Sequence, residues 1–195
     1  MKKSMKFLTG LITALLITGV ATAQHGNSPS GHINLGVKGG VNSYNIHNDN
    51  GVRYDSKLGY NLGMIAHIHF NSRFAFQPEI TYSAQGAKEG NATYNLDYIN
   101  IPVMFQYMYD NGFRLQAGPQ ISFLVNTNLD DISPIDLGVG LGASYVVPST
   151  GFGVDARYNL GLINIHKSGT VNSTNRGFQF GLFYIFGHNT RIVLN

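Results

Sequence analysis

Hydrophobic and polar residues alternate along most of this chain with a period of two. Between 58 and 70, apolar side chains occupy the even positions, whereas the odd positions carry Gly59, Asn61, Gly63, Ile65, His67 and His69. Ile65 is the one exception to the rule. After the polar segment 71–73, the same alternation continues from Phe74 to Ala84. Because successive side chains of a strand point to opposite faces, the stretch 58–84 is predicted to form a β-hairpin with one apolar and one polar face.

The same period predicts eight strands along the chain. Their expected ranges are 33–44, 57–70, 74–87, 94–109, 113–125, 136–147, 152–165 and 177–186. A tilted strand needs about 9 to 11 residues to cross a bilayer, and each of these ranges is long enough. The fourth strand is less regular, because Tyr94, Leu96 and Tyr98 fall on the face opposite to its other apolar residues. A bulge or a position at the rim of a barrel would account for them.

The predicted connections between the strands alternate in length. Longer connections follow the odd strands, at 45–56, 88–93, 126–135 and 166–176. Tight turns follow the even strands, at 71–73, 110–112 and 148–151. Outer-membrane barrels combine short periplasmic turns with long external loops, an even number of strands, and both termini on the periplasmic side. The alternation therefore predicts an outer-membrane barrel with its longer connections outside the cell.

Composition separates a membrane barrel from a soluble one with the same alternation. The water-facing side of a soluble lipocalin-like binder would carry many Lys and Glu residues, yet only 12% of this chain is charged. The polar positions hold mostly Gly, Asn, Gln, Ser and Thr, which suit a narrow enclosed lumen. A closed barrel satisfies every backbone hydrogen bond inside lipid. We therefore predict an all-β fold, an eight-stranded antiparallel up-and-down transmembrane β-barrel, and keep the soluble binder as the alternative class.

The N-terminal segment has the pattern of a signal peptide. Lys2, Lys3 and Lys6 precede an apolar run, and Ala21-Thr22-Ala23 forms a small-x-small cleavage site. We expect a signal peptide at 1–23, a flexible leader at 24–32, the barrel at 33–187 and a tail at 188–195, with export to the outer membrane. Loss of the three lysines takes the net charge from +3 to about zero, so nucleic-acid binding is not expected.

Charged residues at lumen-facing positions are the main candidates for function. These are Lys38, Glu79, Arg114, Asp155 and Arg157. They form either an ion path or a network of salt bridges that plugs the barrel. Side chains fill the interior of an eight-stranded barrel, so the plug is the prediction.

The other motifs are weaker candidates for a functional site. No cysteine is present to bind metal or act as a nucleophile. His67 and His69 form a His-x-His pair, but a zinc site needs three or four protein ligands and no further ligand is evident. The spacing of Asp130, Asp131 and Asp136 matches no EF-hand, and a solvated acidic loop is expected there. Small side chains at 138, 140 and 142 are expected to make room inside the barrel. No arrangement of Ser, His and Asp predicts a hydrolase, so we expect no enzyme activity, metal or cofactor.

The last predicted strand carries a pattern of its own. Gln179, Gly181, Tyr184 and Phe186 are spaced as polar, Gly, aromatic and aromatic residues. This spacing resembles the signal that the outer-membrane barrel assembly machinery reads, although the segment 188–195 follows it here. The resemblance implies that this machinery is a partner during insertion.

Several phrases together resemble the PorT-like outer-membrane β-barrel proteins of the Bacteroidetes. They are 36–42 (GVKGGVN), 76–83 (FQPEITYS) with 85–87 (QGA), 98–102 (YINIP) and 118–120 (GPQ). The resemblance extends over 33–186 and implies an eight-stranded barrel in the outer membrane of a Gram-negative bacterium, without catalytic residues. The PorT branch is associated with protein secretion.

These observations favour a non-enzymatic integral outer-membrane barrel with a structural role or a role in interactions through its external loops. Two alternatives stay open within the same fold: a narrow porin-like pore for small solutes and a barrel component of a secretion system. The expected partners are outer-membrane lipid, the assembly machinery and other envelope or secretion proteins.

Overall fold

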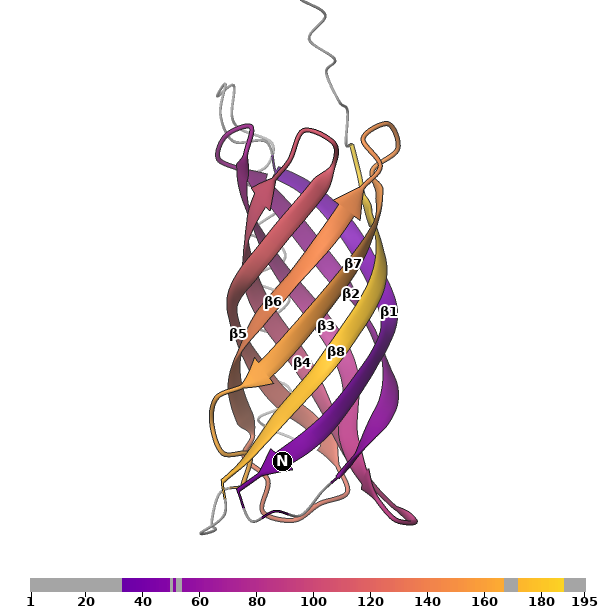
Figure 1. Cartoon of the computed structure of the whole chain (residues 1–195), viewed down its shortest axis with the longest axis vertical. Helices are drawn as coiled ribbons and strands as arrows, with labels where there is room; N and C mark the ends of the chain where they lie inside the picture. The colour runs from indigo at the N-terminus through magenta and orange to yellow at the C-terminus, as the bar shows by residue number, and fades with distance from the viewer. Residues whose placement is uncertain (1–32, 50, 52–53, 167–171, 188–195) are drawn as a thin grey trace, which may run out of the picture.

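A computed structural model describes residues 33–49, 51, 54–166 and 172–187, which form one closed barrel (Figure 1). The strands are β1 (Ile33–Asn48), β2 (Asp55–His69), β3 (Phe74–Glu89), β4 (Ala92–Met108), β5 (Phe113–Thr127), β6 (Ile135–Val146), β7 (Phe152–Gly161) and β8 (Ser173–Ile185). Each strand pairs antiparallel with the next, and β8 pairs with β1 to close the barrel. The predicted eight-stranded up-and-down β-barrel is confirmed. The expected signal peptide (1–23), leader (24–32) and tail (188–195) lie outside the described residues.

The apolar face of the alternation points outward from the barrel. Leu58, Leu141 and Leu182 are 76%, 57% and 67% exposed, whereas the polar residues of the other face are buried in the lumen. A soluble barrel would place these two faces the other way round, because large apolar side chains avoid water. The described part of the chain contains no helix of the length and hydropathy that a membrane span requires.

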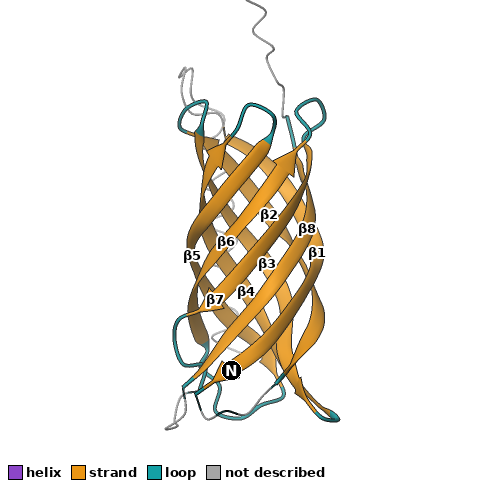
Figure 2. Ribbon diagram, in the orientation of Figure 1, coloured by secondary structure: helices purple, strands orange, loops and turns teal. Residues whose placement is uncertain are grey.

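The two ends of the barrel differ in their connections (Figure 2). Connections 70–73, 109–112 and 147–151 gather at one end, which we call the turn end. At the opposite end, which we call the loop end, β1, β3, β5 and β7 end and the next strands begin; the described connecting residues there are 49, 51, 54, 90–91, 128–134, 162–166 and 172. Local hydrogen bonds fix the tight turns: Asn71 Oδ1 accepts from the backbone N–H of Phe74 at 2.9 Å, and Asn111 Oδ1 accepts from that of Phe113 at 3.1 Å. Such side-chain bonds to the backbone are the reason why Asn favours turns.

Several predicted boundaries are wrong, and β1 continues to Asn48 instead of ending at 44. The expected longer connection at 88–93 is a two-residue turn, because β3 and β4 stay paired as far as Glu89 and Ala92. Gly90 has φ of 57°, which a tight hairpin turn requires and glycine adopts without strain. β7 ends at Gly161 rather than at 165, and β8 begins at Ser173 rather than at 177. The chain after Gly161 turns inward instead, and Ile165 becomes almost fully buried.

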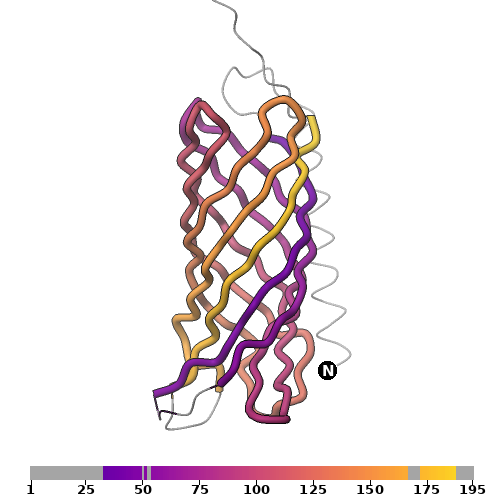
Figure 3. Tube along the Cα trace, turned by 45° about the vertical axis from the view of Figure 1, so that its right-hand side comes forward, coloured from indigo at the N-terminus to yellow at the C-terminus, as the bar shows by residue number. Residues whose placement is uncertain are grey.

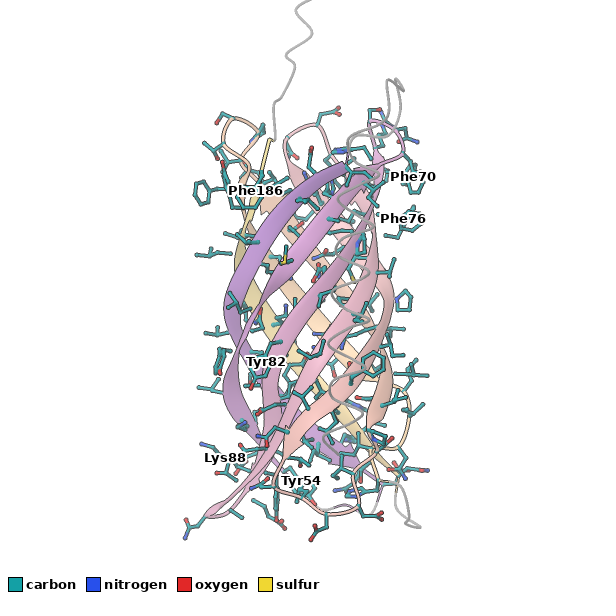
Figure 4. The ribbon with its side chains drawn as sticks, turned by 180° about the vertical axis from the view of Figure 1, so that it is seen from behind. Tyr54, Phe70, Phe76, Tyr82, Lys88 and Phe186 are labelled. Atoms are coloured by element: carbon teal, nitrogen blue, oxygen red, sulfur yellow. The ribbon has the colours of Figure 1, made fainter. Side chains whose placement is uncertain are left out.

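Aromatic side chains ring the outside of the barrel near both ends. At the turn end, Phe70 and Phe76 lie 4.6 Å apart between ring centroids, and Phe152 and Tyr184 lie 4.7 Å apart. Figure 4 shows Phe70, Phe76 and Phe186 at this end, and Tyr54 and Lys88 at the other. Toward the loop end, the ring pairs are Tyr60 with Tyr82 at 5.7 Å and Tyr158 with Phe178 at 4.8 Å. Two aromatic girdles around an apolar band are typical of barrels that cross a bilayer.

Candidate functional site: the lumen of the barrel

Four of the five predicted lumen charges form one cluster inside the barrel, which we call the ion quartet. It consists of Lys38 from β1, Glu79 from β3, and Asp155 and Arg157 from β7. Lys38 Nζ lies 2.7 Å from Asp155 Oδ2, and Arg157 Nη2 lies 2.7 Å from Glu79 Oε1. Two longer contacts of 3.6 Å join Lys38 to Glu79 and Arg157 to Asp155. Each cation therefore touches both carboxylates, and the cluster has no net charge.

Amide side chains extend the ion quartet across the lumen. Gln77 Nε2 donates to Glu79 Oε1 at 2.9 Å, and Gln116 Nε2 lies 3.4 Å from Asp155 Oδ2. Arg157 Nη1 donates a second bond to Glu79 Oε2 at 3.1 Å, so that the guanidinium holds this carboxylate in a two-pronged arrangement. The four charged residues are between 2% and 6% exposed. Buried charges of this kind are tolerated because each is paired and hydrogen-bonded.

Two apolar layers lie in the lumen on either side of the polar network. At the turn end, the layer consists of Ile65, Val146, Phe183 and Ile185. At the loop end, it consists of Ile46, Ala87, Leu96, Tyr98, Ile132 and Ile165. The irregular positions of the sequence pattern belong to these layers. Ile65, Leu96 and Tyr98 point inward. The alternation of inward and outward side chains continues without interruption along β4. The pairing of β4 with β5 shifts by one residue between Asp97 and Tyr98.

Arg114 lies in the lumen as predicted, but the structure does not bring it to the ion quartet. Its side chain is 4% exposed, and it makes no ion pair with a described residue. Its register partners are Met108 of β4 and Ser144 of β6, one residue after β5 begins at the turn end. The sequence pattern correctly predicted that Arg114 faces the lumen. It did not predict that Arg114 lies apart from the other four charged residues.

The expectation of a solvated acidic loop is wrong for Asp136. It is the second residue of β6 and is only 6% exposed, whereas Asp130 and Asp131 are exposed. Asp136 is in phase with the lumen-facing glycines at 138, 140 and 142, so the alternation itself contained the signal for its burial. Gly140 does make room in the lumen, since a Cβ atom there would lie 3.1 Å from Arg157 Cδ.

Among the described residues, no group of three or more His, Cys, Asp and Glu side chains is placed to hold a metal ion. His67 and His69 lie edge to face with ring centroids 4.3 Å apart, and His67 is fully buried. The residues of the expected assembly pattern lie along β8 and just beyond it. Gln179 points into the lumen at 3% exposure, and the rings of Tyr184 and Phe186 contact each other at 5.3 Å in the turn-end girdle.

Comparison with known proteins gives the same picture of the fold. Residues 22–167 match the family described as outer membrane protein beta-barrel domain. No curated protein matches this chain. The crystal structure of Neisserial surface protein A is similar with a TM-score of 0.54 at 18% identity, over 77% of this chain and 96% of that one. Ail, the attachment invasion locus protein of Yersinia pestis, is similar with a TM-score of 0.53 at 15% identity, over 78% of this chain and 98% of that one. At these identities the two similarities show the fold alone.

Proposed function

Because this chain belongs to the family of outer membrane protein β-barrel domains, it is an outer-membrane β-barrel protein, and we propose that its barrel is closed and non-enzymatic. Its role is to provide a rigid wall in the membrane and a presenting surface at the loop end. The observation that supports this function is the ion quartet, which fills the lumen with buried, mutually neutralised charges between two apolar layers. Charges bound to each other in this way leave little attraction for a passing ion.

The loop end has an ordered surface that suits contacts with other molecules. The β3–β4 hairpin projects there, at the bottom of Figure 3. Tyr94 packs edge to face on Tyr54 with centroids 5.9 Å apart, and its hydroxyl donates to Glu89 at 2.8 Å. Asn128 ties the hairpin to the neighbouring loop, since its Oδ1 accepts from the backbone of Asn95 and its Nδ2 donates to that of Thr93. Bonds of this kind hold exposed side chains in place before a partner arrives, which lowers the entropic cost of binding.

Orientation and assembly belong to the same proposal. We infer that the loop end faces outward and the turn end faces the periplasm, that the chain is exported through cleavage after Ala23, and that the pattern of Gln179, Gly181, Tyr184 and Phe186 is read by the assembly machinery. The PorT-like resemblance of the sequence supports the proposal that the protein belongs to that branch of the family, where other envelope or secretion proteins are the expected partners.

Orientation is testable with inserted protease sites in intact cells. We expect a site inserted between Gly90 and Asn91 to be cleaved from outside, because this turn lies at the loop end and both residues are exposed. A matched site after Asn111, in an equally exposed turn at the other end, should be cleaved only after the outer membrane is opened. Cleavage of both sites in intact cells would contradict the orientation.

A closed lumen predicts negligible conductance. The purified protein, inserted into planar bilayers and shown to be folded by its heat-dependent shift in gel mobility, should give no steady channel openings. The matched variant removes the ion quartet without changing net charge, by alanine at Lys38, Glu79, Asp155 and Arg157, together with Phe183→Ala in the turn-end layer and Tyr98→Ala in the loop-end layer. This variant should conduct more than the parent, since it loses the side chains that fill the lumen. Steady, ion-selective openings of the parent protein would favour the pore instead.

A further inference from the structure

A second polar site lies in the lumen between the ion quartet and the loop-end apolar layer. It is an enclosed cavity of about 10 Å³. Its polar lining residues are Tyr44, Gln85, Gln120, Asp136, Asn159 and Asn175. A cavity of this size has room for one water molecule or one ion of similar size. Among the described residues that line it there is one carboxylate, and there is neither Lys nor Arg.

The carboxylate of Asp136 has no counter-charge in the described part of the chain. Its Oδ1 accepts no hydrogen bond from any described residue, although the side chain is 6% exposed. Lys38 and Arg157 are already neutralised within the ion quartet, and Lys57 Nζ, nearer the loop end, donates to the backbone oxygen of the lining residue Gln85 at 2.8 Å. A buried ionised carboxylate without a partner is strongly unfavourable, so the charge of Asp136 is compensated in the folded state either by a proton or by a bound cation.

Two amide side chains that line the same cavity use their nitrogens in hydrogen bonds to other residues. Asn159 Nδ2 donates to the Tyr44 hydroxyl at 2.7 Å, and Asn175 Nδ2 donates to Gln85 Oε1. The Oδ1 atoms of Asn159 and Asn175 are left without a hydrogen-bond donor among the described residues. Both residues are 4% exposed.

A chain of hydrogen bonds contacts the Asn175 amide. Gln85, which accepts from Asn175, donates its own Nε2 to Ser83 Oγ at 3.0 Å, and Asn42 Nδ2 donates to the same hydroxyl at 2.9 Å. While Gln85 donates to Ser83, reversing the Asn175 amide would place an oxygen against the Gln85 oxygen. The residues that line the cavity therefore include three buried side-chain oxygens from three different strands, Asp136 Oδ1, Asn159 Oδ1 and Asn175 Oδ1, none of which accepts a hydrogen bond from a described residue.

We propose that this cavity binds one monovalent hard cation of the Na⁺ class, held by Asp136, Asn159 and Asn175. Hard cations prefer carboxylate and amide oxygens. A single positive charge neutralises the single carboxylate, whereas a divalent ion would leave a net charge buried in the lumen. The ion would be enclosed by the loop-end apolar layer, so it is expected to enter as the barrel folds and to stabilise the folded state.

Reversible unfolding in urea tests the site, because refolding lets the ion enter. The full chain in detergent micelles is compared in sodium chloride and in choline chloride at equal concentration, since choline is too large for the cavity. The folded-to-unfolded ratio is expected to rise with Na⁺ and to reach about 100-fold over choline when Na⁺ is at 100 times its Kd. K⁺, which is larger, should have a weaker effect.

Two variants test whether the stabilisation by Na⁺ depends on Asp136. Asp136→Asn, which removes the charge and keeps the shape, should abolish the difference between Na⁺ and choline. Asp130→Asn removes the same charge at an exposed position of the same end and should keep it. Equal stability of the parent in Na⁺ and choline would overturn the proposal, as would a Na⁺ effect that survives Asp136→Asn, or stabilisation by Ca²⁺ at concentrations where Na⁺ has no effect. If Asp136→Asn does not fold, the ranking of Na⁺, K⁺ and choline on the parent still decides the question.

Discussion

Replacing Glu79 by alanine is expected to destabilise the barrel by about 3 to 5 kcal/mol, the largest effect of any single substitution considered. The change removes the two-pronged partner of Arg157 and one of the two anions near Lys38. Asp155 alone would then face two buried cations. Urea unfolding of the protein in lipid vesicles, followed by the gel shift between folded and unfolded forms, measures the loss.

A charge-balanced double variant distinguishes loss of pairing from loss of packing. Glu79→Ala with Arg157→Ala leaves Lys38 and Asp155 paired at 2.7 Å. Its destabilisation should be smaller than the sum of the two single effects, with a coupling of about 0.5 to 3 kcal/mol. Strictly additive effects would mean that the two side chains act only by filling space.

Arginine at Leu141 is expected to cost about 2 to 4 kcal/mol, because it places a charge in the hydrocarbon near the middle of the bilayer. Leu141 lies in the central part of β6, is 57% exposed, and stands between Ala117 of β5 and Tyr158 of β7 on the outer face. The same urea unfolding in vesicles measures the cost.

The matched control carries the same arginine at Val147, the first residue of a turn-end connection. Val147 is 38% exposed and lies near the edge of the apolar band, where the cost should fall to about 0 to 1 kcal/mol. A Leu141→Arg variant that is as stable as the parent would show that this face does not meet lipid.

The alternation predicted the strands well where all apolar side chains lie on the outer face. It predicted them poorly where some apolar side chains point into the lumen. Ile163 and Ile165 read as the end of a strand, yet Ile165 folds over the lumen mouth, where its backbone N–H donates to the carbonyl of Ser173 at 2.9 Å. Local periodicity cannot distinguish an apolar residue that faces lipid from one that covers the end of a lumen. The same ambiguity made Ile65 and Tyr98 look like exceptions.

The sequence predicted which charged residues face the lumen, but it did not predict which of them form ion pairs with each other. Periodicity placed Lys38, Glu79, Asp155 and Arg157 on the inner face, because that choice depends only on the position within each strand. Which charges meet depends on strand tilt and register, since Lys38 and Asp155 are separated by 117 positions along the chain. Arg114 shares the face and lies at a different level. Asp136 was grouped with the acidic loop, although the predicted sixth strand began at this residue and its position is in phase with the glycines at 138, 140 and 142.

The origin of the ion quartet in β1, β3 and β7 constrains the order of barrel assembly. Lys38 belongs to the first strand, and Asp155, whose oxygen lies nearest to its ammonium group, belongs to the seventh, so this pair and the complete ion quartet form only after nearly the whole chain has been synthesised. An open sheet that entered the membrane early would expose unpaired charges and unpaired strand edges to lipid. Sealing of the β1–β8 seam and neutralisation of the interior are thus one cooperative event. A chain arrested before β7 should be retained outside the bilayer, where chaperones and proteases act on it.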